Sequence, residues 1–265
     1  MNNIFIKLSS KEWELIIAKK FFNDLNKIGF KSIVEMVNKD KVSLKKRGEI
    51  KDLRIETAEK KYSFMVKGYH RGGFFSKIFG DLFVKSDRAF KEAYILAWGA
   101  EHGLKVPEVI SAIKMKKEKI GYLITKKLEN SKDLAEFLND RTLSISLRRK
   151  SLKKSGKIIK DMHDKGILHK DLNIRNIIVS DKEIYIVDFD KAILKKDLKP
   201  IDRVENLRRI DRSFEKYRYF GGNVKKSDYF AFLSGYGDRY LINKCKKGRW
   251  LSLLPHKIAW KLGIT

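Results

Sequence analysis

Cysteine, proline and long apolar runs are scarce in this sequence, and each scarcity excludes a class of protein. The single cysteine, Cys245, cannot form an intramolecular disulfide, so we expect a reducing compartment. Only three prolines are present, which leaves little room for long rigid linkers. No run approaches the roughly 20 apolar residues that span a bilayer, and polar residues appear too early for a signal peptide. The chain is therefore expected in the cytosol or on a cytosolic surface.

Acidic residues are also scarce relative to basic ones. The chain carries 60 Lys and Arg against 33 Asp and Glu, a formal net charge of +27. Such an excess predicts an acidic partner, which could be nucleic acid, an anionic membrane or an acidic substrate. The alternative is a lysine-rich surface without a ligand, as in some thermophiles, although glutamate does not keep pace with lysine here.

The apolar residues indicate a folded protein of two parts. Hydrophobic residues make up 43% of the 265 residues, which is typical of a globular chain. We predict two domains, residues 1–127 and 128–265, with a hinge near residues 128–131. In the first domain, strands are expected between residues 50 and 66 and in a pair that starts at Pro107, and one main helix separates them.

A further helix is predicted at the N-terminus. Ser9-x-x-Glu12 resembles a capping box, apolar residues from 13 to 28 follow at helical spacing, and Gly29 would end the helix. In the second domain, helical spacing recurs near residues 134–138, 152–162 and 204–219.

Two short motifs in the second domain carry the chemistry. HKDLNIRN occupies residues 169–176 and, after a short apolar strand, IYIVDFD occupies residues 184–190. They present Asp171, Asn176 and Asp188 at the spacing that kinases use to hold a hydroxyl nucleophile and magnesium around a nucleotide phosphate. A lone Asp is common in loops, but this joint pattern rarely arises by chance. The sequence therefore predicts phosphoryl transfer.

Each of these residues has an expected role. Asp171 is the predicted base that orients the attacking hydroxyl, and Asn176 and Asp188 are predicted ligands of Mg²⁺, which prefers oxygen donors. His169 is more typical of a residue that supports the loop than of one that reacts. Asp190, the second Asp of DFD, has no assigned role.

A kinase also needs a cation on the nucleotide phosphates and a carboxylate that holds this cation. Lys67 follows a predicted strand, and Glu92 lies in the first half of the main helix. They are the predicted pair. Lys85 is a rival for the lysine, and the alternative is a surface lysine and an ordinary helix glutamate.

Four segments carry a family resemblance: VKGYHRGG (66–73), RAFKEAYILAW (88–98), HKDLNIRNIIV (169–179) and IYIVDFDKA (184–192). Together they resemble the bacterial lipopolysaccharide core kinases, above all those that phosphorylate 3-deoxy-D-manno-octulosonic acid (Kdo) on lipid A precursors. The Asp-Asn-Asp set is shared with all protein-kinase-like folds. HRGG, and DFD in place of DFG, are more specific to this group.

The resemblance implies an α+β, two-lobed, protein-kinase-like fold, with a small, mostly β N-lobe that has one main helix and a larger, mostly α C-lobe. It implies ATP with Mg²⁺ as phosphate donor, and phosphorylation of a sugar hydroxyl at the cytoplasmic face of the inner membrane. Residue by residue, it implies Asp171 as base, Asn176 and Asp188 as metal ligands, and Lys67 with Glu92 as the pair that holds the ATP phosphates.

The sequence departs from ordinary protein kinases in ways that concern the acceptor. The loop expected to cover the nucleotide has a single glycine, Gly48, and Asn173 stands where serine/threonine kinases usually have Lys. No APE motif follows DFD, so a peptide-docking segment is not expected. A small or lipid-linked acceptor fits better.

Taken with this resemblance, the basic residues fit an acidic glycolipid as substrate and an anionic membrane as partner, and no nucleic acid is expected. A tail over residues 244–261 mixes basic residues, among them Arg249, with tryptophan and leucine; it predicts a membrane anchor or a final helix packed on the larger lobe. The basic residues on helices are Arg148, Arg149, Lys150, Lys153, Lys154, Lys157 and Lys160, then Arg203, Arg208, Arg209 and Arg212.

Three alternatives remain. The chain could be a heptose kinase of the same group, or an atypical RIO-like kinase of proteins or small molecules. The third is a pseudokinase or basic module that binds RNA or anionic lipid, but an intact Asp-Asn-Asp set argues against a non-catalytic chain.

Overall fold

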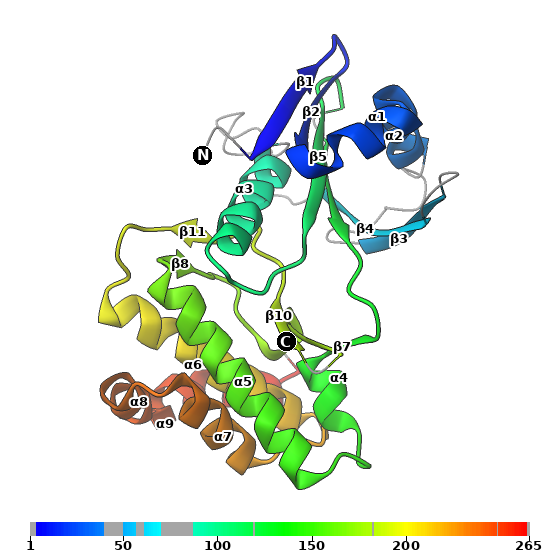
Figure 1. Cartoon of the computed structure of the whole chain (residues 1–265). Coiled ribbons are helices and arrows are strands. Elements are labelled where there is room, and N and C mark those ends of the chain that lie inside the picture. The colour runs from blue at the N-terminus through cyan, green and yellow to red at the C-terminus, as the bar shows by residue number, and fades with distance from the viewer. Residues whose placement is uncertain are drawn as a thin grey trace. The chain divides into compact units, whose positions relative to one another are not determined.

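The computed structural model describes residues 4–39, 50–56, 61–69, 87–118, 120–181, 183–247 and 249–263. The chain divides into two compact units. The first comprises Met1–Ala100 and Pro107–Lys127, and the second comprises Glu101–Val106 and Leu128–Thr265. Strands dominate the first unit and helices dominate the second (Figure 1). The expected α+β class is confirmed.

The first unit is built on an antiparallel sheet with the strand order β1-β2-β5-β6-β4-β3. The strands and the main helix predicted between residues 50 and 125 are confirmed as β3, β4, α3, β5 and β6. In chain order the elements are β1 (Phe5–Ser9), β2 (Trp13–Ala18), a 3₁₀ turn (Lys19–Phe21), α1 (Phe22–Ile28), α2 (Phe30–Lys39), β3 (Ile50–Glu56), β4 (Lys61–Tyr69), α3 (Asp87–Glu101), β5 (Val109–Met115) and β6 (Ile120–Lys126).

The N-terminal helix predicted for residues 13–28 is wrong in its first half, which is strand β2. Leu15, Ile16 and Ile17 are all buried, because both faces of the sheet are covered. A short apolar run of this kind cannot be told from a helix segment by its spacing. The capping box is also absent: Ser9 lies in β1, and the Ser10 hydroxyl accepts from the Glu12 and Trp13 N–H groups (both 3.1 Å) in the β1–β2 turn.

The sheet separates two helical layers, with α3 on the side away from α1 and α2 (Figure 1). Apolar residues of α1 and α2, including Leu25 and Val34, form one cluster with Phe64 and Val66 of β4. Because side chains alternate along a strand, Lys67 points to the opposite face of β4. This alternation directs Lys67 toward α3.

The second unit contains two small sheets, with the orders β10-β9-β7 and β11-β8, and a set of helices. Its elements are β7 (Ser131–Asp133), α4 (Leu134–Asn139), α5 (Ile145–Asp164), β8 (Ile167–Leu168), a 3₁₀ turn (Ile174–Asn176), β9 (Ile177–Ser180), β10 (Glu183–Ile186), β11 (Ile193–Leu194), α6 (Pro200–Tyr219), α7 (Lys226–Tyr236), α8 (Arg239–Lys246) and α9 (Arg249–Lys261).

Helices α5 and α7 contact each other through their backbones. A Cβ on Gly156 of α5 would lie 1.9 Å from the Phe232 carbonyl oxygen, and one on Gly235 of α7 would lie 1.9 Å from the Lys153 carbonyl oxygen. Only glycine permits this approach. The close contact holds α5, which leads directly into β8 and the loop with the HKDLNIRN motif.

The prediction that Arg148 belongs to an anion-binding surface is wrong. Its guanidinium is buried and forms two hydrogen bonds with the Asp228 carboxylate, at 3.0 and 2.6 Å. It also donates to the carbonyls of Leu138 (2.7 Å) and Asn223 (2.5 Å). Arg148 therefore joins α4, α5 and α7, and four of its five N–H donors are used within the fold.

Candidate active site

The HKDLNIRN motif forms a loop between β8 and β9 that is held by its own hydrogen bonds. The buried His169 ring donates from Nε2 to the Val187 carbonyl (3.0 Å), and its Nδ1 accepts from the Asp171 N–H (3.3 Å). Burial lowers the pKa of His169, so the imidazole is neutral at physiological pH. These contacts fit the expected supporting role, because both ring nitrogens are occupied by backbone groups.

Two side chains of the loop donate hydrogen bonds to the backbone of Asp171. The side-chain amides of Asn173 and Asn176 both donate to the Asp171 carbonyl oxygen at 3.0 Å. The Asp171 carboxylate remains half exposed, with its Oδ2 atom 2.9 Å from Lys191 Nζ. The backbone of the proposed base is thus fixed, while its carboxylate stays accessible.

Asn176 and Asp188 are neighbours through the backbone. The Val187 N–H donates to the Asn176 carbonyl at 3.0 Å, which places the next residue, Asp188, beside Asn176. Since the Asn176 amide nitrogen is bound to Asp171, its side-chain oxygen is left to accept or to coordinate. Asp188 has φ of +65°, a left-handed conformation that costs a non-glycine residue about 1–3 kcal/mol.

The donor set suits Mg²⁺ better than a metal held by protein alone. One amide oxygen and one carboxylate are hard ligands, and Mg²⁺ usually takes one or two such groups and completes its shell with phosphates and water. Among the described residues, no group of three or more His, Cys, Asp or Glu side chains could hold a metal ion. A metal here would depend on the phosphates of a bound nucleotide.

The predicted cation and carboxylate of the first unit form an ion pair. Lys67 Nζ lies 2.9 Å and 3.2 Å from the two carboxylate oxygens of Glu92. Glu92 is only 2% exposed and also accepts from the Tyr69 hydroxyl. The structure therefore brings Lys67 and Glu92 together. The rival Lys85, the single-glycine loop at Gly48 and the HRGG segment lie outside the described residues.

Lys191 is the site residue that the sequence interpretation missed. It follows the DFD motif directly and reaches back to Asp171. A signal was present: Asn173 stands where many kinases have a lysine next to the base, so a lysine from elsewhere in the chain could have been sought.

The arginines that follow DFD divide into two groups. Arg203 binds Asp164 (2.6 Å), and Arg208 donates to carbonyls at the C-terminal end of α8, Lys244 (3.5 Å) and Lys247 (3.2 Å). Both arginines are therefore engaged in contacts within the second unit. Arg209 and Arg212 instead line a pocket.

The C-terminal tail forms α8 and α9. Arg249, one of the basic residues of the tail predicted to be a membrane anchor or a packed final helix, binds Asp211 (2.7 and 2.9 Å) and Glu215 (2.7 Å) of α6. Leu253 and Trp260 are buried, at 3% and 7% exposure. The packed final helix is thus the better description of this face of α9.

Comparison with known proteins places the chain in a family. The pattern of the family described as "Lipopolysaccharide kinase (Kdo/WaaP) family" matches residues 38–236, a span that includes all five predicted site residues. The chain belongs to the lipopolysaccharide kinase (Kdo/WaaP) family. The resemblance inferred from the sequence is confirmed, and with it the prediction of a phosphotransferase that acts on a sugar hydroxyl.

Several members of this family are similar over most of the chain. The 3-deoxy-D-manno-octulosonic acid kinase of Vibrio cholerae serotype O1 is 33% identical over 179 residues, which are 64% of this chain and 73% of the relative. The kinase of the same name from Vibrio vulnificus (strain CMCP6) is 35% identical over 191 residues, 66% of this chain and 75% of the relative.

A solved structure shares the fold. It is described as "WaaP in complex with acyl carrier protein", superposes with a TM-score of 0.60 and is 18% identical in sequence. The match covers 94% of this chain and 98% of that chain. The kinase-like fold is therefore confirmed for nearly the whole chain.

Proposed function

We propose that this protein is an ATP-dependent kinase that phosphorylates a hydroxyl of Kdo on a lipid A precursor. The observation that carries the proposal is the loop geometry: one carbonyl, that of Asp171, accepts from Asn173 and Asn176, and a backbone hydrogen bond from Val187 places Asp188 beside Asn176. This arrangement presents a base and two oxygen ligands at neighbouring positions, which is what phosphoryl transfer requires.

The roles follow from the contacts. Asp171 accepts the hydrogen bond of the acceptor hydroxyl, because its carboxylate is exposed while its backbone is fixed. Asn176 and Asp188 hold Mg²⁺, which neutralises charge on the ATP phosphates when bound. Lys67 contacts those phosphates as well, and the buried Glu92 keeps its ammonium in place.

Lys191 places a positive charge beside the carboxylate of the proposed base. Its ammonium lies 2.9 Å from the Asp171 carboxylate and is half exposed, so it can move from this carboxylate to an incoming phosphate. In this proposal Lys191 supplies the positive charge that a lysine at the position of Asn173 supplies in many kinases.

Kdo is favoured as the acceptor because the similar relatives carry that name and because Kdo brings a carboxylate, and lipid A precursors bring phosphates, to a chain with a net charge of +27. A heptose of the inner core is the second candidate acceptor. Among the described residues, no helix is long and apolar enough to cross a membrane.

Helix α9 supports a peripheral position on an anionic membrane. Leu254 and Ile258, with Leu262 directly after the last residue of α9, follow at intervals of four residues and are 38%, 52% and 67% exposed. At about 100° per residue they form one stripe, on the face opposite the buried Trp260. Exposed Lys257 lies at the edge of this stripe. An apolar stripe edged by lysine is typical of a helix that lies on anionic lipid, here the cytoplasmic face of the inner membrane.

The activity is tested by incubating the purified protein with ATP, Mg²⁺ and a Kdo-lipid A precursor, followed by mass spectrometry. We expect one added phosphate on the glycolipid, and transfer at least about 10²-fold slower with Asp171→Asn. A heptose-bearing acceptor and a generic protein acceptor run in parallel. Absence of transfer to any core sugar, or transfer to protein alone, would overturn the assignment.

The membrane position is tested by co-flotation with vesicles of neutral or anionic lipid. We expect binding that requires anionic lipid and weakens with Ile258→Glu. Ile145→Glu is the matched control, because Ile145 is also exposed (65% against 52% for Ile258) but lies at the start of α5. Equal flotation of both variants would contradict the role of the α9 stripe.

A further inference from the structure

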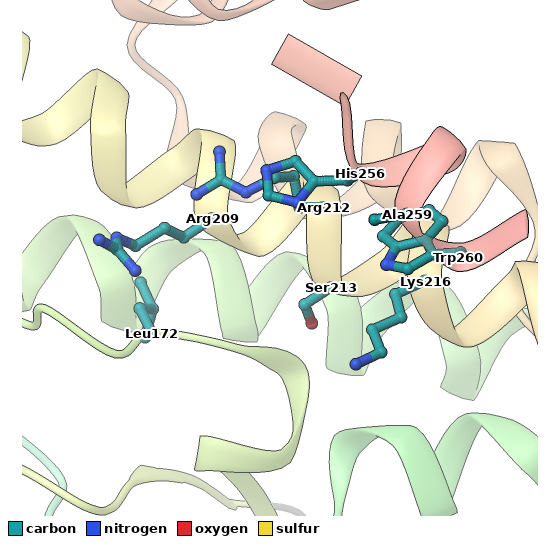
Figure 2. A pocket seen from close by; sticks show the side chains of 8 residues that line it. All are labelled: Leu172, Arg209, Arg212, Ser213, Lys216, His256, Ala259 and Trp260. Carbon is teal, nitrogen blue, oxygen red and sulfur yellow. The ribbon is translucent and has the colours of Figure 1, made fainter. Parts of the chain in front are cut away.

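A pocket beside the proposed catalytic loop has no role in the mechanism above. It lies in the second unit and has a cavity volume of about 400 Å³. Figure 2 shows its wall: α6 contributes Arg209, Arg212 and Lys216, α9 contributes His256 and Trp260, and the loop contributes Leu172, the residue after Asp171. A volume of this size is typical of small-molecule sites.

The pocket is tied to the catalytic loop by a direct contact. The hydroxyl of Ser213, which also lines the pocket, accepts from the Ile174 N–H at 2.8 Å. Ser213 lies on α6 between Arg212 and Lys216. A group bound to this face of α6 is therefore held at a fixed position relative to the loop that carries Asp171.

The cations of the pocket form no ion pair with the described residues. Arg209, Arg212 and Lys216 are spaced by three and four residues, so they share one face of α6. In the described part of the chain, none of the three lies within ion-pair distance of an acidic side chain. Of the acids on this helix, Asp211 and Glu215 are bound by Arg249, whereas Glu205 lies one turn before Arg209 and acts on Arg212 only through its charge.

Arg212 is the partly buried cation of this set, whereas Arg209 and Lys216 are exposed. Burial lowers the pKa of Arg212, and the neighbouring Arg209 adds to this effect. Burial, followed by the charge of Arg212, also lowers the pKa of His256, so this imidazole is a neutral donor at physiological pH. Cations at these helix spacings repel one another. A bound anion would offset the repulsion and part of the desolvation cost of Arg212.

Leu172, Ala259 and Trp260 form an apolar part of the wall. The Trp260 indole is buried and packs against Tyr219 (5.8 Å between ring centroids), which fixes its orientation. Leu172 is also buried and stands on the side of the catalytic loop. The pocket thus combines a cationic wall with a rigid apolar one, which suits a sugar ring that bears an acidic group.

We propose that this pocket binds an anionic group of the acceptor glycolipid, either a phosphate or a sugar carboxylate, and thereby brings the acceptor hydroxyl to Asp171. This rests on the proposed function. Arg209 and Arg212 bind the anion through their guanidinium forks, and Lys216 adds a third charge. The bound acceptor would be oriented from α6, while ATP is held by residues that the pocket does not include.

Charge removal on α6 tests the proposal. In Arg209→Gln/Lys216→Gln we expect KM for the glycolipid to rise at least about tenfold, because each lost charge-assisted contact is worth roughly that factor, with KM for ATP unchanged. The matched control is Lys226→Gln/Arg239→Gln, which removes the same two charges from exposed positions on α7 and α8. Its KM for the glycolipid should stay within about twofold of wild type.

Modified acceptors identify the anion. Two acceptors are compared: one without lipid A phosphates, and one whose Kdo carboxylate is converted to an amide. The acceptor that lacks the group held by the pocket should bind equally to wild type and to Arg209→Gln/Lys216→Gln, here called the α6 variant. Binding to the Asp171→Asn protein is measured in parallel, so that the pocket is tested without turnover. If the α6 and control substitutions, each combined with Asp171→Asn, give equal affinity for the glycolipid, the proposal that the pocket binds the acceptor is wrong. Absence of transfer by wild type would instead overturn only the proposed function.

Discussion

Replacing Arg148 by Met tests whether this arginine stabilises the fold or binds the glycolipid. In the structure, Arg148 is buried and paired with Asp228, whereas Arg149, the next residue, is exposed. We expect Arg148→Met to destabilise the protein strongly and to leave the affinity of the correctly folded fraction for the glycolipid unchanged. We expect Arg149→Met to have little effect on stability.

The magnitude follows from the partners that remain. Without the guanidinium, the Asp228 carboxylate keeps the Lys225 N–H (2.7 Å) but loses both charged contacts, and the Leu138 and Asn223 carbonyls lose their donor. Breaking a buried ion pair in this way costs about 3–5 kcal/mol. At about 2 °C per kcal/mol for a chain of this length, Tm should fall by roughly 6–10 °C.

The assay is urea unfolding followed by circular dichroism, with thermal unfolding in parallel. Arg149→Met should stay within about 0.5 kcal/mol of wild type. Arg148→Met/Asp228→Asn should recover part of the loss, because it removes the uncompensated charge. If Arg148→Met is no less stable than Arg149→Met, or if the double variant shows no coupling, the reading of this pair as a buried structural contact is wrong.

Three further predictions concern the loop and its support. Asp171→Asn should lower kcat by at least about 10²-fold while nucleotide binding, followed by calorimetry, is retained; turnover at the wild-type rate would remove Asp171 as the base. Lys191→Met should lower kcat by about tenfold or more, whereas Lys196→Met, an exposed lysine nearby, should not; equal kcat values would show that the contact with Asp171 is incidental. The buried His163 has a pKa lowered to about 4 from 6.5, chiefly by burial, so between these values the unfolded chain binds more protons than the folded one. Its contribution to stability is thus complete above about pH 6.5 and is lost as the pH falls toward 4, by an amount on the order of 3 kcal/mol. Unfolding free energies at pH 7.5 and 5.0 should therefore differ less in His163→Gln than in wild type, and identical slopes would contradict this account.

The N-terminal strand shows why part of the fold escaped prediction. Residues 15–17 are three consecutive apolar side chains, and their spacing is compatible with a helix or with a strand covered on both faces. The outcome depends on β5, a segment far along the chain that pairs with β2. The strands β3, β4, β5 and β6 were predictable, because alternation and turn residues are local signals.

The roles of the basic residues were also only partly predictable from the sequence. Composition predicts an acidic partner, but it cannot say which cations are available to it. Arg148 and Asp228 lie 80 residues apart, and Arg249 and Asp211 lie 38 apart, so their pairing requires the folded chain. Arg209 and Arg212 look no different from Arg208 in the sequence, yet they face a pocket while Arg208 caps α8.

The sequence by itself determined the family, the α+β class and the residues of the catalytic loop, because a functional loop is a contiguous motif whose spacing is set by a few backbone hydrogen bonds. It also named Lys67 and Glu92, which the sheet and α3 bring to 2.9 Å. Only the tertiary structure decided which charges hold the fold and which remain for a ligand, revealed Lys191 beside Asp171, and placed α6 and α9 around a pocket. Burial and ion pairing depend on which segments meet in space, and no local pattern contains that information.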